Sequence, residues 1–201
     1  MTAPRLVPMD LAMEPATLEE IRRSVRAGGV LAIPTDTFYG LAADPLSEAA
    51  IGRIFALKGR SAAQALPVVV ASAAQLAELG VQAPDAILAK LEAIWPAPLT
   101  AVLPITRPIA ASGGARTLAV RVPALASLRA LLASIGPLTA TSANRSGFPP
   151  ARTASEALEA CGAGIDFVLD GGASESALPS TLVDLTKSPP EILRSGAFSW
   201  S

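Results

Sequence analysis

Short apolar segments alternate with stretches of helical length along most of this chain. Residues 30–33 and 66–71 are apolar at successive positions, which is typical of strands buried on both faces. Further strands are predicted at residues 99–103, 117–122, 138–141, 165–169, 180–184 and 191–194, and further helices at residues 73–79, 85–94 and 125–135. This alternation predicts an α/β fold in which several strands deliver polar residues to one rim.

Three more helices are predicted from their capping residues. Thr17 to Glu20 reads as a capping box, and the helix that it opens would end at Gly28. Ser47 would cap a helix that runs to the lysine at position 58. Either Thr153 or Ser155 would cap the helix that reaches the single cysteine, and the pattern leaves both open.

The composition limits the class of protein. With 201 residues, 51% of them hydrophobic, the chain can bury one ample core, and a single domain over residues 1–201 is expected. Because no run of about 18 apolar residues occurs, we expect no membrane span. The N-terminus does not resemble a signal peptide. One cysteine, Cys161, fits a reducing compartment, so a cytoplasmic location is expected.

The chain contains no histidine, which removes Ser-His-Asp catalysis and most zinc sites. Chemistry must therefore rest on carboxylates, lysine, arginine, tyrosine, hydroxyls and backbone groups. Cys161 is predicted to be a core residue rather than a nucleophile, because no imidazole can activate it.

Charge is distributed unevenly although the net charge is only −1. No acidic residue lies between Glu92 and Glu156, and that interval holds six arginines: Arg107, Arg116, Arg121, Arg129, Arg145 and Arg152. Such a segment is a candidate surface for binding anions. The alternative is that arginine simply replaces lysine in this composition, which explains the choice of cation but not the missing acids.

The tripeptide Lys58-Gly59-Arg60 is a candidate phosphate site, because an ammonium and a guanidinium fork together suit an oxyanion. The chain has only three lysines, so a lysine here is unusual. Taken alone, the tripeptide is more often a solvated helix C-terminus whose cations complement the helix dipole. Two loops that follow strands, residues 35–43 and 142–147, are rich in hydroxyls and glycine and are candidate site loops, with ordinary turns as the alternative.

Seven stretches of the chain resemble the motifs of one family in order and spacing. They are Pro34-Thr-Asp-Thr-Phe-Tyr-Gly-Leu41, Lys58-Gly-Arg60, Trp95-Pro-Ala-Pro-Leu-Thr100, Ala119-Val-Arg-Val-Pro123, Thr141-Ser-Ala-Asn-Arg-Ser-Gly147, Ser180-Thr-Leu-Val-Asp184 and Ile192-Leu-Arg-Ser-Gly196. Over nearly its whole length the chain resembles YrdC-type domains, the threonylcarbamoyl-AMP synthase family. The fold implied is a twisted, mixed open β-sheet with flanking helices and a concave, positively lined groove.

The resemblance implies that L-threonine, bicarbonate (or carbon dioxide) and ATP give L-threonylcarbamoyladenylate and pyrophosphate, for threonylcarbamoyladenosine formation in tRNA. The implied ATP-binding residues are Lys58, Arg60, Thr117, Asn144, Arg152 and Arg194, with Lys58 and Arg60 also catalytic. The implied residues for threonine and bicarbonate are Thr35, Tyr39, Arg121, Ser142 and Ser180. Mg²⁺ is expected with ATP, without a named protein ligand. The implied partners are tRNA-modification proteins that accept the adenylate.

The chain departs from the family pattern at a few positions. Ser61, Ala65, Ala97 and Arg152 stand where proline, a polar residue, glycine and threonine are common, and they affect the phosphate loop and one nucleotide contact. The second domain of longer members is not expected here.

Two other functions fit part of the pattern. An RNA-binding or ribosome-assembly module would need broad basic charge and exposed aromatic residues, but aromatic residues make up only 4% of the chain. A related ATP-dependent enzyme with another acceptor, or with carbamoyl phosphate as substrate, is the stronger alternative.

Overall fold

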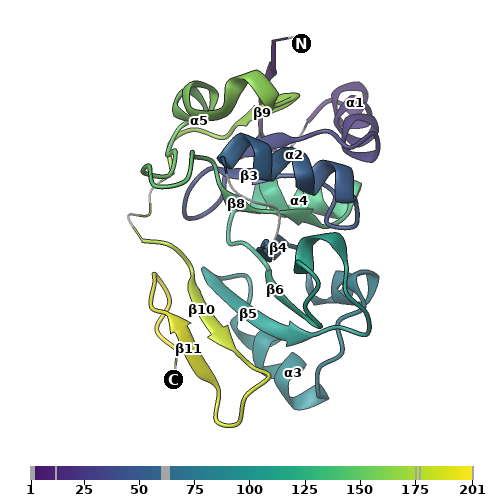
Figure 1. Cartoon of the computed structure of the whole chain (residues 1–201), viewed down its shortest axis with the longest axis vertical. Coiled ribbons are helices and arrows are strands. Elements are labelled where there is room, and N and C mark those ends of the chain that lie inside the picture. The colour runs from purple at the N-terminus through teal and green to yellow at the C-terminus, as the bar shows by residue number, and fades with distance from the viewer. Residues whose placement is uncertain (1–2, 12, 60–63, 175, 177, 201) are drawn as a thin grey trace.

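The computed structural model describes residues 3–11, 13–59, 64–174, 176 and 178–200. Its strands form two mixed sheets, which lie one above the other in Figure 1. The upper sheet has five strands in the order β1-β9-β2-β3-β8, and the lower sheet has six in the order β11-β10-β5-β6-β4-β7. The predicted α/β class and mixed strand pairing are therefore confirmed, but the strands are divided between two sheets rather than one.

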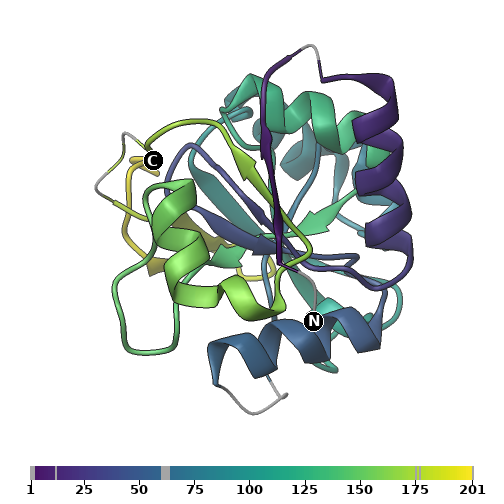
Figure 2. The same cartoon turned by 90° about the horizontal axis from the view of Figure 1, so that it is seen from above.

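The five-stranded sheet consists of β1 (Arg5–Pro8), β9 (Phe167–Asp170), β2 (Leu31–Ile33), β3 (Gly40–Ala42) and β8 (Thr141–Ser142). Strands β1, β9 and β2 run parallel, whereas β3 and β8 are antiparallel to their neighbours. Both faces of this sheet are covered by helices, as Figure 2 shows from above. Helices α1 (Pro15–Arg26) and α4 (Ala126–Ile135) cover one face, and α2 (Glu48–Lys58) and α5 (Ala154–Cys161) cover the other.

The alternation of side chains along β2 explains why the sheet needs both helix layers. Leu31 and Ile33 pack in the cluster that holds the apolar faces of α1 and α4, whereas Ala32 packs in the cluster with α2 and α5. Successive residues of a strand point to opposite faces, so a continuously apolar strand must be covered twice.

The six-stranded sheet consists of β11 (Glu191–Arg194), β10 (Thr181–Asp184), β5 (Leu99–Pro104), β6 (Thr117–Arg121), β4 (Val68–Val69) and β7 (Leu138–Thr139). The antiparallel pairing of β10 with β11 confirms the strand pair expected at the C-terminal end. Helix α3 (Asp85–Ile94) lies beside β5 in Figure 1 and buries Leu91. The described residues also form short 3₁₀ helices, which are η1 (Ala73–Leu79), η2 (Ala110–Ser112) and η3 (Gly162–Gly164).

The two sheets meet where β7 passes into β8. These strands are separated by Ala140 alone, yet β7 pairs with β4 in the lower sheet and β8 pairs with β3 in the upper sheet. The backbone N–H of Thr139 donates to the carbonyl of Ala43 at 2.9 Å, and the N–H of Ala43 donates to Thr139 Oγ1 at 3.0 Å. The predicted single strand at residues 138–141 is therefore two short strands, each of which pairs within a different sheet.

The predicted caps fare differently. Ser47 Oγ accepts from the N–H of Ala50 and Thr153 Oγ1 accepts from the N–H of Glu156, so both are helix caps. The capping box at Thr17 is wrong, because α1 already begins at Pro15, a residue whose fixed φ suits the first turn. The predicted strand at residues 66–71 is reduced to the two residues of β4, and the helix at residues 73–79 is a 3₁₀ helix.

Cys161 is buried in the core, as predicted. Within the described part of the chain, none of the helices is both long enough and apolar enough to cross a membrane.

Candidate functional site

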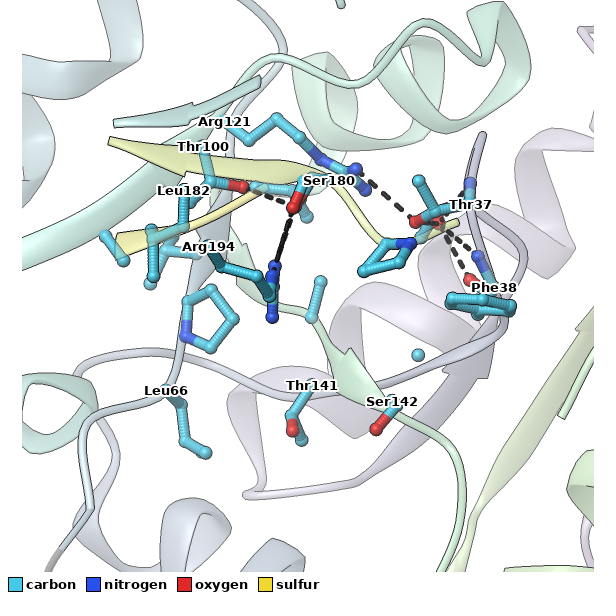
Figure 3. A pocket seen from close by; sticks show the side chains of 18 of the residues that line it. Thr37, Phe38, Leu66, Thr100, Arg121, Thr141, Ser142, Ser180, Leu182 and Arg194 are labelled. Carbon is cyan, nitrogen blue, oxygen red and sulfur yellow. Dashed lines mark hydrogen bonds between the residues drawn. The ribbon is translucent and has the colours of Figure 1, made fainter. Parts of the chain in front are cut away.

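A cavity of about 750 Å³ lies between the two sheets (Figure 3). Its described lining residues are Thr35, Thr37, Phe38, Tyr39, Gly40, Ala65, Leu66, Pro67, Val68, Val69, Thr100, Val102, Thr117, Ala119, Arg121, Ala140, Thr141, Ser142, Pro150, Pro179, Ser180, Leu182 and Arg194. They come from both sheets and from the junction at Ala140. The size falls within the range of about 300–1,000 Å³ that is common for small-molecule sites.

Strand β6 forms much of the cavity floor. Thr117, Ala119 and Arg121 all line the cavity, as expected for alternate residues on one face of a strand. Arg121 lines the cavity, and its charged side chain is nearly buried, with 5% of the residue surface exposed.

Among the described residues, Arg121 has few contacts for a guanidinium. Its Nη2 lies 3.3 Å from Oδ1 of Asp36, and its Nη1 donates to Thr37 Oγ1 at 3.4 Å. Burial lowers the pKa of Arg121, the charge of Asp36 acts in the opposite direction, and the charge of Arg194 lowers it further. Arginine remains protonated at any physiological pH, so the floor of the cavity carries a permanent positive charge.

A second arginine lies on the neighbouring strands. Arg194 of β11 donates through Nε and Nη2 to the backbone carbonyl of Ser180 at 3.1 and 2.9 Å, and through Nη2 to Ser180 Oγ at 3.1 Å. Ser180 Oγ also shares a hydrogen bond of 2.8 Å with Thr100 Oγ1. Partial desolvation lowers the pKa of Arg194, although the residue as a whole is exposed. These bonds fix both the hydroxyl and the guanidinium at one side of the cavity (Figure 3).

The loop between β2 and β3 closes the cavity from the upper sheet. Thr35 Oγ1 accepts from the N–H groups of Thr37 and Phe38 at 3.1 and 3.2 Å, and it donates to the carbonyl of Phe38 at 2.7 Å. The hydroxyl of Thr35 thus shapes this loop, and its predicted contact with a substrate stays a prediction.

Tyr39 lines the cavity, but its hydroxyl bonds elsewhere. The hydroxyl donates to the carbonyl of Gly172 at 2.7 Å and accepts from the N–H of Gly171 at 3.2 Å, while Asp170 Oδ1 lies 3.4 Å away. Desolvation by burial raises the pKa of Tyr39 to about 12, so the phenol is neutral at physiological pH. Its hydroxyl fixes the turn after β9, and the predicted role in holding threonine is untested.

Lys58 ends α2 as a buried ammonium with 1% of its surface exposed. Its Nζ donates to the carbonyl of Ser142, to the carbonyl of Asn144 at 3.2 Å and to Asn144 Oδ1 at 2.8 Å. The left-handed conformation of Gly59, with φ of 64°, ends the helix directly after it. Lys58 therefore binds the loop that follows β8, and Ser142 separates its ammonium from the cavity.

The structure brings most of the predicted site residues together. The cavity is lined by Thr35, Tyr39, Thr117, Arg121, Ser142, Ser180 and Arg194. Lys58 and Asn144 lie behind Ser142 rather than in the lining. Arg152 is exposed and donates to the carbonyl of Ser174 at 3.0 Å, and neither of these two residues lines the cavity. Arg60 lies outside the described residues.

Among the described residues, four polar residues of the site were missed by the sequence analysis. One of them, Thr141, lines the cavity one residue before Ser142. Asp36 and Thr37 contact Arg121, and Thr100 bonds Ser180. Asp36 and Thr37 belong to the hydroxyl-rich loop at residues 35–43, which was predicted as a site loop. The prediction assigned no role to either residue. Thr100 is the polar residue within the apolar strand at 99–103, and that exception was the available signal.

Fold and site together define the class of protein. Among the described residues that line the cavity two are arginines and none is acidic, while several carry hydroxyls. The chain is thus a mixed α/β protein whose two sheets enclose a cavity with two arginines in its described lining, a composition that suits a small anionic ligand. The model of the Sua5/YciO/YrdC family, described as "Telomere recombination", matches residues 23–196, and the chain belongs to this family.

Curated relatives carry a functional name. The threonylcarbamoyl-AMP synthase of Pyrococcus abyssi is 40% identical over 175 residues, which are 86% of this chain and 52% of that protein. The threonylcarbamoyl-AMP synthase of Thiobacillus denitrificans is 40% identical over 165 residues, which are 80% of this chain and 87% of that protein.

A solved structure has the same fold. The crystal structure of Pyrococcus abyssi Sua5 complexed with L-threonine superposes with a TM-score of 0.87 at 36% identity and covers 97% of this chain and 58% of that one. The chain thus spans little more than half the length of the Pyrococcus abyssi protein.

Proposed function

We propose that this protein is an L-threonylcarbamoyladenylate synthase. It would convert L-threonine, bicarbonate and ATP into threonylcarbamoyl-AMP, pyrophosphate and water. The observation that carries the proposal is the cavity itself: residues of six separate family motifs line it, with two arginines and no acidic residue among its described lining. The names of the relatives in Pyrococcus abyssi and Thiobacillus denitrificans support the proposal, as does the L-threonine in the related Sua5 structure.

The reaction needs two anions held close together. The amine of threonine captures the one-carbon unit, the resulting carbamate oxygen attacks the α-phosphate of ATP, and pyrophosphate leaves. Bringing the carbamate and the phosphate together accelerates the reaction by position and by charge neutralisation. Arg121 and Arg194 supply two fixed positive charges inside one cavity, which fits this requirement.

In the proposed arrangement, Arg121 receives the carboxylate of threonine on the cavity floor. Ser180 and Ser142 offer hydroxyls to threonine or to the carbamate, and Thr35 and Tyr39 shape the wall beside them. Because Arg194 is already held by Ser180, it is ready to bind the nucleotide without further ordering.

The phosphates are proposed to lie against the rim formed by Ser142. Lys58 Nζ is 3.5 Å from Ser142 Oγ, so a phosphate at this hydroxyl would lie one side chain away from the ammonium. Arg60 is proposed as the second phosphate ligand. Thr117 and Asn144 are proposed to contact the nucleotide. Arg152 is also proposed to bind ATP, although its guanidinium donates to the carbonyl of Ser174 in the present structure.

Mg²⁺ is proposed to arrive with ATP. Among the described residues no group of three or more His, Cys, Asp or Glu side chains could hold a metal ion. We therefore assign no protein ligand to the ion and no step to it. The product is proposed to pass to tRNA-modification proteins. The cytoplasm is the proposed location because a chain with one cysteine fits a reducing compartment.

The test measures pyrophosphate release from ATP and bicarbonate, with and without L-threonine, together with mass spectrometry of the adenylate. Release that depends on threonine, with the adenylate detected, is the expected result. Release without threonine would instead favour the related enzyme with another acceptor or with carbamoyl phosphate. Tight, salt-sensitive RNA binding without ATP turnover would favour the RNA-binding alternative.

A further inference from the structure

A buried ion pair joins the two sheets beside the cavity. Arg121 is on β6 of the lower sheet, and Asp36 is in the loop between β2 and β3 of the upper sheet. Their side chains are 6% and 12% exposed. The other ion pairs of the described residues, Arg5–Glu20, Arg22–Glu19 and Arg53–Asp166, lie at the surface. Among the ion pairs of the described residues, Arg121–Asp36 is thus the pair in which both side chains are largely buried.

Neither carboxylate oxygen of Asp36 has a hydrogen-bond partner among the described residues, although both are buried. A forked Arg–carboxylate pair would satisfy both oxygens with two parallel N–H bonds, whereas here a 3.3 Å contact joins one oxygen to one nitrogen. Buried carboxylate oxygens without donors destabilise a fold, so stability alone does not account for this pair. Its geometry also leaves N–H groups of Arg121 available to a ligand.

Asp36 acts on the cavity through Arg121. Arg121 lines the cavity and Asp36 does not, so the carboxylate lies behind the guanidinium as seen from a ligand. Arg194 lines the same cavity and repels Arg121. The negative charge of Asp36 opposes this repulsion and holds the guanidinium against the floor.

We propose that Asp36 is a positioning residue that directs the N–H groups of Arg121 into the cavity and thereby sets the affinity for the carboxylate of an amino-acid substrate. Taking that substrate to be L-threonine rests on the proposed function. Removing Asp36 would also remove a charge that repels the substrate carboxylate. Loss of position outweighs this effect: a displaced guanidinium loses charge-assisted hydrogen bonds to the carboxylate, which are worth about ten- to 100-fold in affinity. The charge of Asp36, in contrast, is already offset by Arg121.

The experiment uses Asp36→Asn, which keeps the size of the side chain and removes its charge. Isothermal titration calorimetry compares L-threonine with L-threoninamide, which lacks the carboxylate. Wild type should prefer threonine, and Asp36→Asn should bind threonine about ten- to 100-fold more weakly with its affinity for the amide unchanged. Asp166→Asn is the matched control, because it removes the pair of Arg53 with Asp166, 2.8 Å long, outside the cavity, and it should keep the preference.

A second readout does not need threonine. The Nε–H signal of Arg121 in ¹⁵N NMR, assigned by its loss in Arg121→Lys, should be sharp in wild type and broadened by exchange in Asp36→Asn. If Asp36→Asn does not fold, Asp36→Ser removes the charge without burying an amide and replaces it in both measurements.

The outcomes separate the two proposals. Loss of the preference in Asp36→Asn with the control unchanged supports the positioning role. An unchanged preference and an unchanged Arg121 signal overturn it. If wild type binds neither ligand, the threonine substrate of the proposed function is wrong, and the NMR signal alone decides: broadening in Asp36→Asn supports positioning, and a retained sharp signal overturns it.

Discussion

Among single residues, Lys58 combines two roles that an experiment can separate. Its ammonium bonds the carbonyls of Ser142 and Asn144 inside the protein, and it is also the proposed phosphate ligand. Lys58→Met keeps most of the apolar stem and removes only the ammonium. Because three acceptors would each lose a charged donor, we expect the free energy of unfolding in urea to fall by about 1–3 kcal/mol. Turnover should fall by at least about 100-fold, the scale of a lost stabilising charge.

Two comparisons make the Lys58 prediction specific. Lys90→Met changes an exposed lysine that contacts the Trp200 ring at 4.2 Å, and it should cost no more than about 1 kcal/mol. Arg60→Ala should lower turnover by a similar factor of about 100 if it grips phosphates. Near-wild-type rates in both Lys58→Met and Arg60→Ala would contradict the phosphate assignment, whereas unchanged stability in Lys58→Met would contradict the binding of the loop by its ammonium.

Tyr39 gives a pH dependence whose sign follows from its burial. Its pKa is raised from 10.0 to about 12, so between these values the unfolded chain loses the phenolic proton before the folded chain does. The stability that Tyr39 contributes is therefore complete below pH 10 and is lost as the pH rises to about 12. Denaturation of wild type and Tyr39→Phe from pH 8 upward measures it. The difference in unfolding free energy between the two should decline in that window, and a constant difference would contradict the burial of the phenol.

At the scale of the elements, the start of α5 offers a matched pair of substitutions. Thr153 Oγ1 accepts from the N–H of Glu156 at 3.1 Å, and the Glu156 carboxylate accepts from the N–H of Arg152 at 2.7 Å. Thr153→Ala should lower the unfolding free energy by about 1 kcal/mol, as loss of a cap usually does. Ser155→Ala, the alternative cap from the sequence, should stay within about 0.5 kcal/mol because this side chain is exposed. Equal costs in chemical denaturation would argue against Thr153 as the cap.

Structural elements that are determined by the local sequence could be predicted. The period of two along residues 117–121 placed Thr117 and Arg121 on one face, and that face lines the cavity. The strand at 66–71 was predicted too long because its apolar run is only partly paired, a matter of tertiary partners. The passage of the chain from one sheet to the other at Ala140 could not be predicted either. The sequences of β7 and β8 do not indicate which sheet each strand joins.

The site could be predicted as a set of segments but not as a set of contacts. The motifs named the strands and loops that meet in the cavity, because their polar residues interrupt apolar sequence. Whether a side chain then points to a ligand or to another segment depends on residues far away in the chain. Tyr39 bonds Gly172, 133 residues later, and Asp36 faces Arg121 from the other sheet. No local pattern encodes such pairs.

At the scale of the whole molecule, one apolar core spans both sheets. The larger buried cluster contains Val30 and Ala32 of the upper half together with Leu99 and Val120 of the lower half. A core shared in this way should unfold in one step, so we predict a single two-state transition for the chain, in line with one domain over residues 1–201.

Each half carries its own probe for that transition. Trp95 precedes β5 of the lower sheet, and Cys161 ends α5 against the upper sheet. The thiol is buried, and desolvation raises its pKa, so a thiol reagent should label it only after unfolding. Urea titrations followed by tryptophan fluorescence and by labelling of Cys161 should give the same midpoint and the same slope, with Cys161→Ala as the blank.

Ligand binding should affect both probes equally. Saturation with ATP and threonine at about 100 times their dissociation constants should raise the free energy of unfolding measured by each probe by about 2.7 kcal/mol for each ligand. Two midpoints, or a ligand shift confined to one probe, would mean that the sheets unfold as separate domains and that the cavity between them is not the shared binding site.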